Sequence, residues 1–200
     1  MIRVKICGIT RLEDALAAAD AGVDAIGLVF VKASRRFLAP EAAATICRAL
    51  PPFVSRVGLF MDADPDWVER CLAEARLDWL QFHGKESAAY CAGFGRPWIK
   101  AIAMADAEQS WRSHANADAL LLDSHASGEL GGTGKSFDWN RIPKLDRPWI
   151  LAGGLNPDNV AEACRLLRPD AVDLSSGVEI QPGIKDVKLI NRFMENIRHG

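Results

Sequence analysis

Short apolar runs with the length and branched side chains of β-strands alternate with helical segments along the chain. The expected strands lie at 3–8, 25–30, 55–60, 79–83, 98–103, 119–123, 149–153 and 171–175. Ala- and Leu-rich segments with helical periodicity separate them, at 12–21, 40–50, 65–75, 157–168 and 186–198, with weaker helical patterns at 86–93 and 106–114 and a short turn at 138–142. Successive strand–helix units require parallel strands joined by right-handed crossovers.

Eight such units favour an α/β fold of the (βα)8 TIM-barrel type rather than an open sheet. No linker-like stretch divides the 200 residues, so we expect a single domain over 1–200. Merging two of the weaker strands would leave a flavodoxin-like or Rossmann sheet, and this length is the lower limit for a barrel. Against the open sheet, no Gly-rich turn follows the first strand and no acidic residue is placed to bind a ribose.

Polar side chains recur on the strand face that a barrel would turn inward. Alternation places them on the first, fourth, sixth and eighth strands: Lys5 and Cys7, Gln81 and His83, Asp123, and Asp173 and Ser175. Because branched apolar side chains normally fill a barrel, this set predicts a pocket in the upper layers. We expect Lys5 to pair with Asp173 at barrel closure. Gln81 and His83 could both be satisfied core residues; that is our expectation for Gln81, whereas His83 is kept as a substrate-binding candidate.

Two of these residues stand where α/β proteins keep their chemistry, at the carboxyl ends of strands. Cys7 is a potential nucleophile or base, or else a small buried hydrophobe. Asp123 ends an apolar triple and precedes a Gly-rich loop, so a purely structural role explains it poorly. After Cys7, we expect Thr10 to cap the following helix, with Glu13 closing a capping box.

Two Gly-bearing loops follow the seventh and eighth strands, where barrels frequently bind phosphate. The candidate phosphate ligands are Gly153, Gly154, Ser175, Ser176 and Gly177. Tight turns alone would also explain such glycines, but two loops at adjacent strand ends favour phosphate held by amides and hydroxyls.

Two other segments carry possible binding chemistry. The run 128–136 is not a phosphate-binding loop of the nucleotide type, because Glu129 stands where a glycine is required; we expect a flap over the barrel mouth. Arg36 follows the second strand and is suited to a planar carboxylate.

Composition sets the broad class. The net charge of −2 and the absence of charge blocks argue against nucleic acid or an anionic membrane as partner. The apolar runs are too short to span a bilayer, and the N-terminal residues do not form a signal peptide. Five cysteines without C-x-x-C spacing argue against a disulfide framework or a zinc site, so we expect a cytoplasmic protein without a metal.

Six motifs, each at a strand end, stand out along the chain: Val4-Lys-Ile-Cys-Gly-Ile-Thr10, Gln81-Phe-His-Gly84, Leu121-Leu-Asp123, Gly131-Gly-Thr-Gly-Lys-Ser-Phe-Asp-Trp139, Gly153-Gly-Leu-Asn-Pro157 and Val172-Asp-Leu-Ser-Ser-Gly-Val-Glu179. Taken together, they resemble the phosphoribosylanthranilate isomerases of tryptophan biosynthesis over essentially the whole chain. The resemblance implies a (βα)8 barrel and an Amadori rearrangement without cofactor. It makes Cys7 the general base, Asp123 the general acid and Arg36 the ligand of the anthranilate carboxylate, and it assigns the two Gly-bearing loops to phosphate.

Two alternatives stay open at this point. One alternative is the family of aminoaldose isomerases of histidine biosynthesis. That family is characterised by a pair of aspartates at strand ends, whereas the first strand here ends in Cys7. A catalytically inactive phosphate-binding barrel would need neither Cys7 nor Asp123. The expected partner is a small phosphosugar, with the protein acting as a monomer or homodimer.

Overall fold

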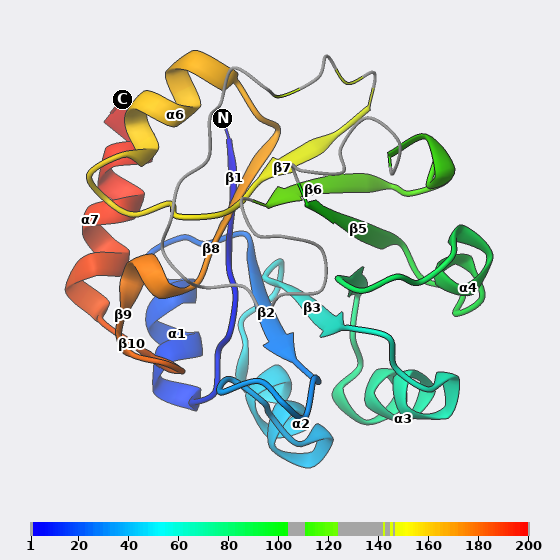
Figure 1. Ribbon diagram of the computed structural model, residues 1–200. Helices are drawn as coiled ribbons and strands as arrows, with labels where there is room; N and C mark the ends of the chain where they lie inside the picture. Colours follow the sequence, from blue (N-terminus) through cyan, green and yellow to red (C-terminus); the bar gives the residue numbers. More distant parts are fainter. Residues whose placement is uncertain (1, 104–110, 124–141, 143–144, 146, 200) are drawn as a thin grey trace.

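The computed structural model describes residues 2–103, 111–123, 142, 145 and 147–199, and eight of its strands form one parallel barrel. These strands are β1 Arg3–Ile6, β2 Ala25–Val29, β3 Ser55–Phe60, β4 Trp79–Phe82, β5 Trp98–Ala103, β6 Ala119–Asp123, β7 Trp149–Leu151 and β8 Ala171–Leu174. Each strand pairs with its neighbours in chain order, and β1 pairs with β8 to close the barrel (Figure 1). The predicted barrel is confirmed, and the open-sheet alternative is wrong.

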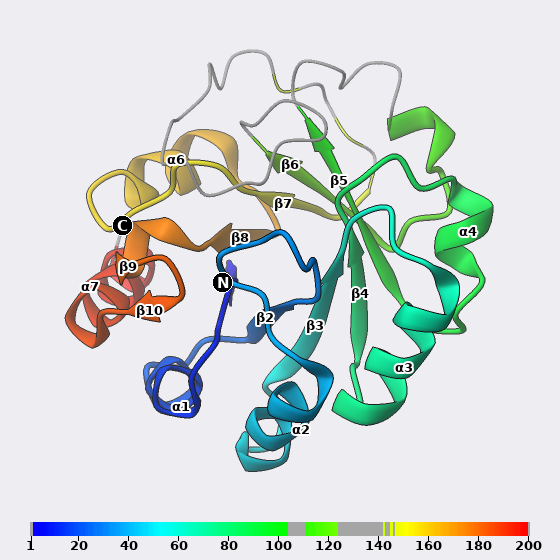
Figure 2. The same cartoon turned by 60° about the horizontal axis from the view of Figure 1, so that its bottom comes forward.

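Helices cover the outside of the barrel (Figures 1 and 2). They are α1 Leu12–Asp20, α2 Pro40–Ala49, α3 Pro65–Ala75, α4 Ala88–Ala92, α6 Val160–Leu167 and α7 Val187–His199. All six occur where the sequence predicted helices, with ends shifted by up to three residues. Of the weak pattern at 106–114, residues 111–113 are helical and 106–110 lie outside the described residues, as does most of the expected turn at 138–142.

Two apolar layers explain why the strands close. Val4 and Ile6 belong to the large cluster that packs strands against helices. A second cluster fills the barrel interior, and its buried members are Val57, Ile99, Ala101, Ala119, Leu121, Ile150 and Ala152.

Lys5 and Asp173, which are register partners on β1 and β8, form the expected ion pair at 2.9 Å between Nζ and Oδ1. Polar side chains therefore lie inside the barrel together with an apolar layer, as the alternation predicted.

A short hairpin after β8 was not predicted. A 3₁₀ turn, η3 (Ser176–Val178), leads into β9 (Glu179–Gln181), which pairs antiparallel with β10 (Ile184–Lys185). The turn between the two strands contains Pro182 and Gly183, which has φ of 85°. This hairpin lies beside α7 and near the start of α1 in both views (Figures 1 and 2).

The expected capping box at the start of α1 is wrong. The residue that caps the helix is Arg11, whose side chain makes no capping hydrogen bond. Thr10 Oγ1 donates instead to the carbonyl of Gly183 in the hairpin turn. Glu13 is largely exposed and pairs with Arg11. Thr10 thus donates to a distant carbonyl instead of accepting from a backbone N–H of its own helix.

The other four cysteines lie in helices, as expected. Cys47, Cys71, Cys91 and Cys164 are buried free thiols on α2, α3, α4 and α6, and burial raises the pKa of each to about 11 or 12. Among the described residues, no helix is both long and apolar enough to cross a lipid bilayer.

Candidate active site

One pocket opens where the barrel strands end and gathers nearly all the predicted site residues. Cys7, Arg36, His83, Asp123, Gly153, Gly154, Ser175 and Ser176 line it. Apolar side chains from the second and third strand ends, among them Val29 and Leu59, complete its wall. Gly177 is not among the described lining residues. The pocket thus combines an apolar wall with thiol, carboxyl, imidazole and guanidinium groups.

The Cys7 thiol is held immediately after β1. The backbone N–H of Cys7 donates to the Leu174 carbonyl on β8 at 2.8 Å, which continues the barrel ladder by one residue. Gly27 on β2 makes room for the sulfur, because a Cβ there would lie 2.7 Å from Sγ. Burial raises the pKa of the thiol, while the nearby Lys5 and Lys185 ammonium groups lower it in part. The thiol is therefore protonated at rest, next to cations that stabilise its thiolate.

Lys5 has a second contact that the sequence did not suggest. Besides its ion pair with Asp173, its side chain lies with the Cys7 sulfur against Gly27, and its positive charge favours the Cys7 thiolate. Burial alone would lower the pKa of Lys5, but the Asp173 and Cys7 groups outweigh it and the pKa is raised. A permanently charged ammonium thus lies beside the candidate base.

Asp123 and His83 face each other from the ends of β6 and β4. The distance from His83 Nε2 to Asp123 Oδ2 is 3.6 Å. Burial lowers the pKa of His83 and outweighs the attraction of the Asp123 carboxylate. The imidazole is therefore neutral near pH 7.

Gln81 differs from expectation. Its side chain is buried and lines the pocket, yet Oε1 has no hydrogen-bond partner among the described residues. Its Nε2 lies 3.5 Å from His83 Nδ1, at the limit of a hydrogen bond. The interpretation of Gln81 as a satisfied core residue is wrong for the described part of the chain, which offers its oxygen no donor.

The two Gly-bearing loops lie against each other beside the pocket. The carbonyl of Gly154 accepts from Asn159 Nδ2 at 2.9 Å, which holds the first loop. In the second, a Cβ on Gly177 would lie 1.9 Å from the Leu155 carbonyl oxygen of the first. Gly177 therefore contributes by close packing of the loops. The expected flap at 128–136 lies outside the described residues.

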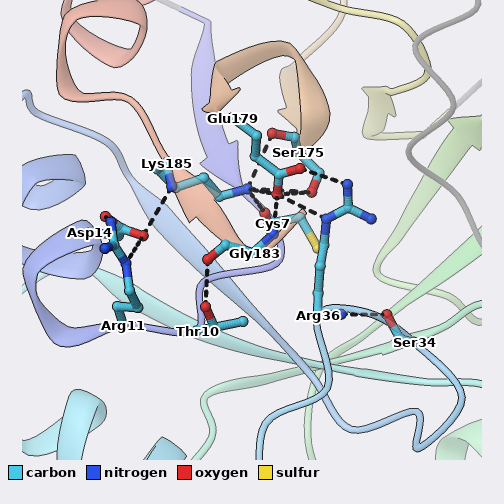
Figure 3. Close-up of polar contacts among 10 residues, drawn as sticks. All are labelled: Cys7, Thr10, Arg11, Asp14, Ser34, Arg36, Ser175, Glu179, Gly183 and Lys185. Atoms are coloured by element: carbon cyan, nitrogen blue, oxygen red, sulfur yellow. Dashed lines mark hydrogen bonds and ion pairs between the residues drawn. The ribbon is translucent and has the colours of Figure 1, made fainter. Parts of the chain in front are cut away.

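Arg36 reaches the pocket over the backbone of Gly8, which has φ of 74° and whose Cβ would lie 2.4 Å from Arg36 Cδ. The guanidinium binds Glu179 with two hydrogen bonds, from Nε to Oε1 at 2.8 Å and from Nη2 to Oε2 at 2.6 Å (Figure 3). Lys185 Nζ binds the same carboxylate at 2.8 Å. Glu179 and Lys185 were missed from the sequence, although the Pro-Gly turn between them is a hairpin signal.

Comparisons with known proteins agree with these motifs. The sequence model of the N-(5′-phosphoribosyl)anthranilate isomerase family matches residues 4–196. The N-(5′-phosphoribosyl)anthranilate isomerase of Acidithiobacillus ferrooxidans is 53% identical over 201 residues, covering 99% of this chain and 98% of that protein.

Solved structures are similar over the same extent. The phosphoribosyl anthranilate isomerase of Thermus thermophilus superimposes with a TM-score of 0.89 at 43% identity, over 98% of both chains. Another phosphoribosyl anthranilate isomerase was solved with reduced 1-(o-carboxyphenylamino)-1-deoxyribulose 5-phosphate; its TM-score is 0.80 at 38% identity, over 99% of both chains. This chain belongs to the N-(5′-phosphoribosyl)anthranilate isomerase family.

Proposed function

We propose that this protein converts N-(5′-phosphoribosyl)anthranilate to 1-(2-carboxyphenylamino)-1-deoxy-D-ribulose 5-phosphate in L-tryptophan biosynthesis. The observation that carries the proposal is the pocket itself, in which a thiol, a carboxyl group and two Gly-bearing loops meet at the strand ends. Family membership supports the same reaction. The rearrangement moves protons only, so an acid and a base suffice and we propose no cofactor.

Asp123 acts as the general acid in this proposal. It protonates the furanose ring oxygen, the C1–O bond breaks, and the nitrogen lone pair forms a Schiff base. A carboxyl group of ordinary pKa near 3.9 is ionised at pH 7, so Asp123 must be kept protonated by its surroundings to act as an acid. His83, neutral and 3.6 Å from Asp123, is compatible with that role, because a neutral imidazole does not stabilise the carboxylate as an imidazolium would.

Cys7 acts as the general base. As a thiolate it removes the proton from C2 of the Schiff base; the resulting enolamine then takes up a proton at C1, loses the proton of its C2 hydroxyl and becomes the ketone. The raised pKa of the thiol keeps the thiolate scarce at neutral pH. Lys5 and Lys185 increase the fraction of thiolate, because both ammonium groups stabilise the negative charge on the Cys7 sulfur.

The remaining pocket residues bind the two ends of the substrate. Gly153, Gly154, Ser175 and Ser176 hold the phosphate, with Gly177 keeping the two loops in contact, and Arg36 takes the anthranilate carboxylate. The unpartnered Gln81 oxygen accepts a hydrogen bond from a sugar hydroxyl, which supports a ligand rich in hydroxyl groups. We further propose a cytoplasmic protein, monomeric or homodimeric, in keeping with five buried free thiols.

Turnover of anthranilate and phosphoribosyl pyrophosphate, coupled through the preceding transferase, tests the function. The product should form only when both enzymes are present. Cys7→Ala and Asp123→Asn should each lower kcat by about 10²- to 10⁴-fold, because each removes one proton-transfer group. Cys47→Ala, which removes a buried thiol on α2, should leave kcat unchanged.

The pH profile provides an independent readout of the same pair. The proposal predicts a bell-shaped kcat/KM, whose rising limb requires the thiolate and whose falling limb requires the protonated acid. A flat profile with chemistry rate-limiting would contradict acid–base catalysis by this pair. An inactive wild-type protein that still binds phosphosugars would indicate the binding barrel instead.

A further inference from the structure

Behind the pocket, four side chains from separate segments form a buried cluster. Arg36 follows β2, Ser175 follows β8, and Glu179 and Lys185 belong to β9 and β10 (Figure 3). We call these residues the Glu179 cluster. Arg36 and Ser175 line the pocket, whereas Glu179 and Lys185 are not among its described lining residues.

Glu179 decides which edge of the Arg36 guanidinium is available. Both oxygens of its carboxylate accept hydrogen bonds from Arg36, one from Nε and one from Nη2. These two nitrogens form the side-on edge of the guanidinium. Nη1 points away from Glu179 (Figure 3) and makes no hydrogen bond with any residue that the structure describes. A guanidinium has a second bidentate edge formed by Nη1 and the outer N–H of Nη2. That end-on edge is the one left to receive a carboxylate from the pocket.

Lys185 supplies a positive charge next to Arg36 and Glu179. Arg36 and Glu179 alone would be a neutral pair and would attract an anion weakly. The ammonium of Lys185, whose side chain is fully buried, lies 2.8 Å from Glu179 Oε1. Burial lowers the pKa of Lys185, and the Glu179 carboxylate opposes that shift; in its charged form Lys185 leaves the cluster with one net positive charge. A buried ion pair is poor evidence of a role in stability, because desolvation offsets its attraction. A role in anion binding accounts for keeping this cation in the interior.

The same ammonium connects the cluster to the candidate base. Lys185 Nζ also donates to the carbonyl of Cys7 at 2.6 Å and to that of Ser175 at 3.1 Å. The Ser175 hydroxyl lies 3.4 Å from Glu179 Oε1. One buried cation thus holds the backbone at the end of β1, the start of the phosphate-type loop and the Arg36 anchor in a common geometry.

We propose that Glu179 and Lys185 are positioning residues: Glu179 orients the end-on edge of Arg36, and Lys185 keeps it electropositive, so that the pocket selects arylamino phosphosugars with an ortho carboxylate. The proposal rests on the proposed function. It differs from a simple charge effect, because removing the Glu179 charge would by itself strengthen attraction for an anion.

Calorimetric binding of two ligands tests it without requiring turnover. One ligand is reduced 1-(o-carboxyphenylamino)-1-deoxyribulose 5-phosphate, and the other is the same compound with an unsubstituted phenyl ring. The wild type should prefer the carboxylated ligand by about 10- to 100-fold, the range of a charge-assisted bidentate pair. Glu179→Gln should reduce that preference by about tenfold, while affinity for the phenyl ligand stays within about threefold. Lys185→Met should also reduce the preference by about tenfold, but it should weaken both ligands as well, because the same ammonium group holds Ser175.

Two controls separate positioning from general loss of structure. Glu86→Gln breaks the buried Lys100–Glu86 pair, whose 2.8 Å distance matches that of Lys185–Glu179, and should leave the preference at the wild-type value. In an Arg36→Met background, Glu179→Gln should cause no further loss of preference, because Glu179 acts through Arg36. Glu179→Asp, which keeps the charge with a shorter reach, should give an intermediate preference.

Equal weakening of both ligands in Glu179→Gln, or an unchanged or increased preference, overturns the positioning role and leaves the proposed function standing. A wild-type protein that binds neither ligand and shows no turnover overturns the proposed function, and this inference with it.

Discussion

Gln81 illustrates how a single atom can indicate a binding site. An amide oxygen buried without a donor costs free energy, on the order of 1–3 kcal/mol, that a folded protein normally avoids. Here the oxygen without a partner among the described residues belongs to a side chain that lines the pocket with Cys7 and Asp123. A ligand hydroxyl would satisfy it, which makes Gln81 a candidate for substrate binding.

Replacing Gln81 by Met should therefore separate stability from activity. Methionine has a similar volume and no polar atom, so we expect a melting temperature equal to or above that of the wild type. The kcat/KM should fall about tenfold, the usual effect of one lost hydrogen bond to the substrate. Thermal unfolding and steady-state kinetics measure the two effects; a lower melting temperature with unchanged kcat/KM would argue that the oxygen has a structural partner.

The hairpin of β9 and β10 illustrates how a small element positions chemistry. It is attached to α1 by the Lys185 N–H, which donates to Asp14 Oδ2 at 3.0 Å, and by Thr10, which donates to the Gly183 carbonyl (Figure 3). Asp14 is buried and is itself bound by Arg11. These contacts hold the hairpin, and with it Glu179 and Lys185, against the barrel. The preceding η3 turn packs on the loop after β7 through Gly177.

Gly177→Ala should disturb both the packing of η3 and ligand binding. The new methyl group would lie 1.9 Å from the Leu155 carbonyl oxygen, so one loop must move. We expect a loss of about 1–3 kcal/mol in the free energy of unfolding, as for an overpacked site, together with a higher KM. Urea unfolding and kinetics provide the measurements.

Gly93→Ala is the matched control. Gly93 has an ordinary helical φ of −68°, and its added methyl group would lie 3.2 Å from the nearest carbonyl oxygen. This variant should change the free energy of unfolding by less than about 0.5 kcal/mol. Equal effects of the two substitutions would show that contact with Leu155 is not the cause.

Across the barrel, buried charges connect the two ends of the chain. Lys5 pairs with Asp173 where β1 meets β8, and Arg36 and Lys185 converge on Glu179 nearby. Although burial raises the pKa of Glu179, the hydrogen bonds and charges of Arg36 and Lys185 outweigh it and lower the pKa to about 2. The ionised form of Glu179 is therefore more stable in the folded barrel than in the unfolded chain.

The stability of the barrel should therefore depend on Glu179 in acid. A lowered folded-state pKa contributes stability that is present above the unfolded-state pKa, near 4.3, and is lost as the pH falls toward 2. Between pH 5 and pH 3 this one group should contribute a loss of about 1.5 kcal/mol. Urea unfolding of the wild type and of Glu179→Gln should show their stability difference narrowing by that amount; a constant difference would contradict the lowered pKa.

Much of this protein follows from local sequence. Strand alternation predicted eight strands, the inward polar set and the Lys5–Asp173 pair, because the period of a strand and the chemistry of its side chains are local properties. The strand ends predicted a pocket containing Cys7, Asp123 and the two Gly-bearing loops, because parallel strands place their carboxyl ends at one edge.

Three features required the folded chain. Thr10 serves the hairpin rather than its own helix, the Gln81 oxygen has no described partner, and Arg36 is already held by Glu179, which lies 143 positions away. Each depends on which groups become neighbours once the barrel closes, and a hydrogen bond forms with the nearest suitable group in space. The sequence by itself therefore determined the barrel and its candidate chemistry, whereas the tertiary contacts decided which groups hold Arg36, Thr10 and Gln81.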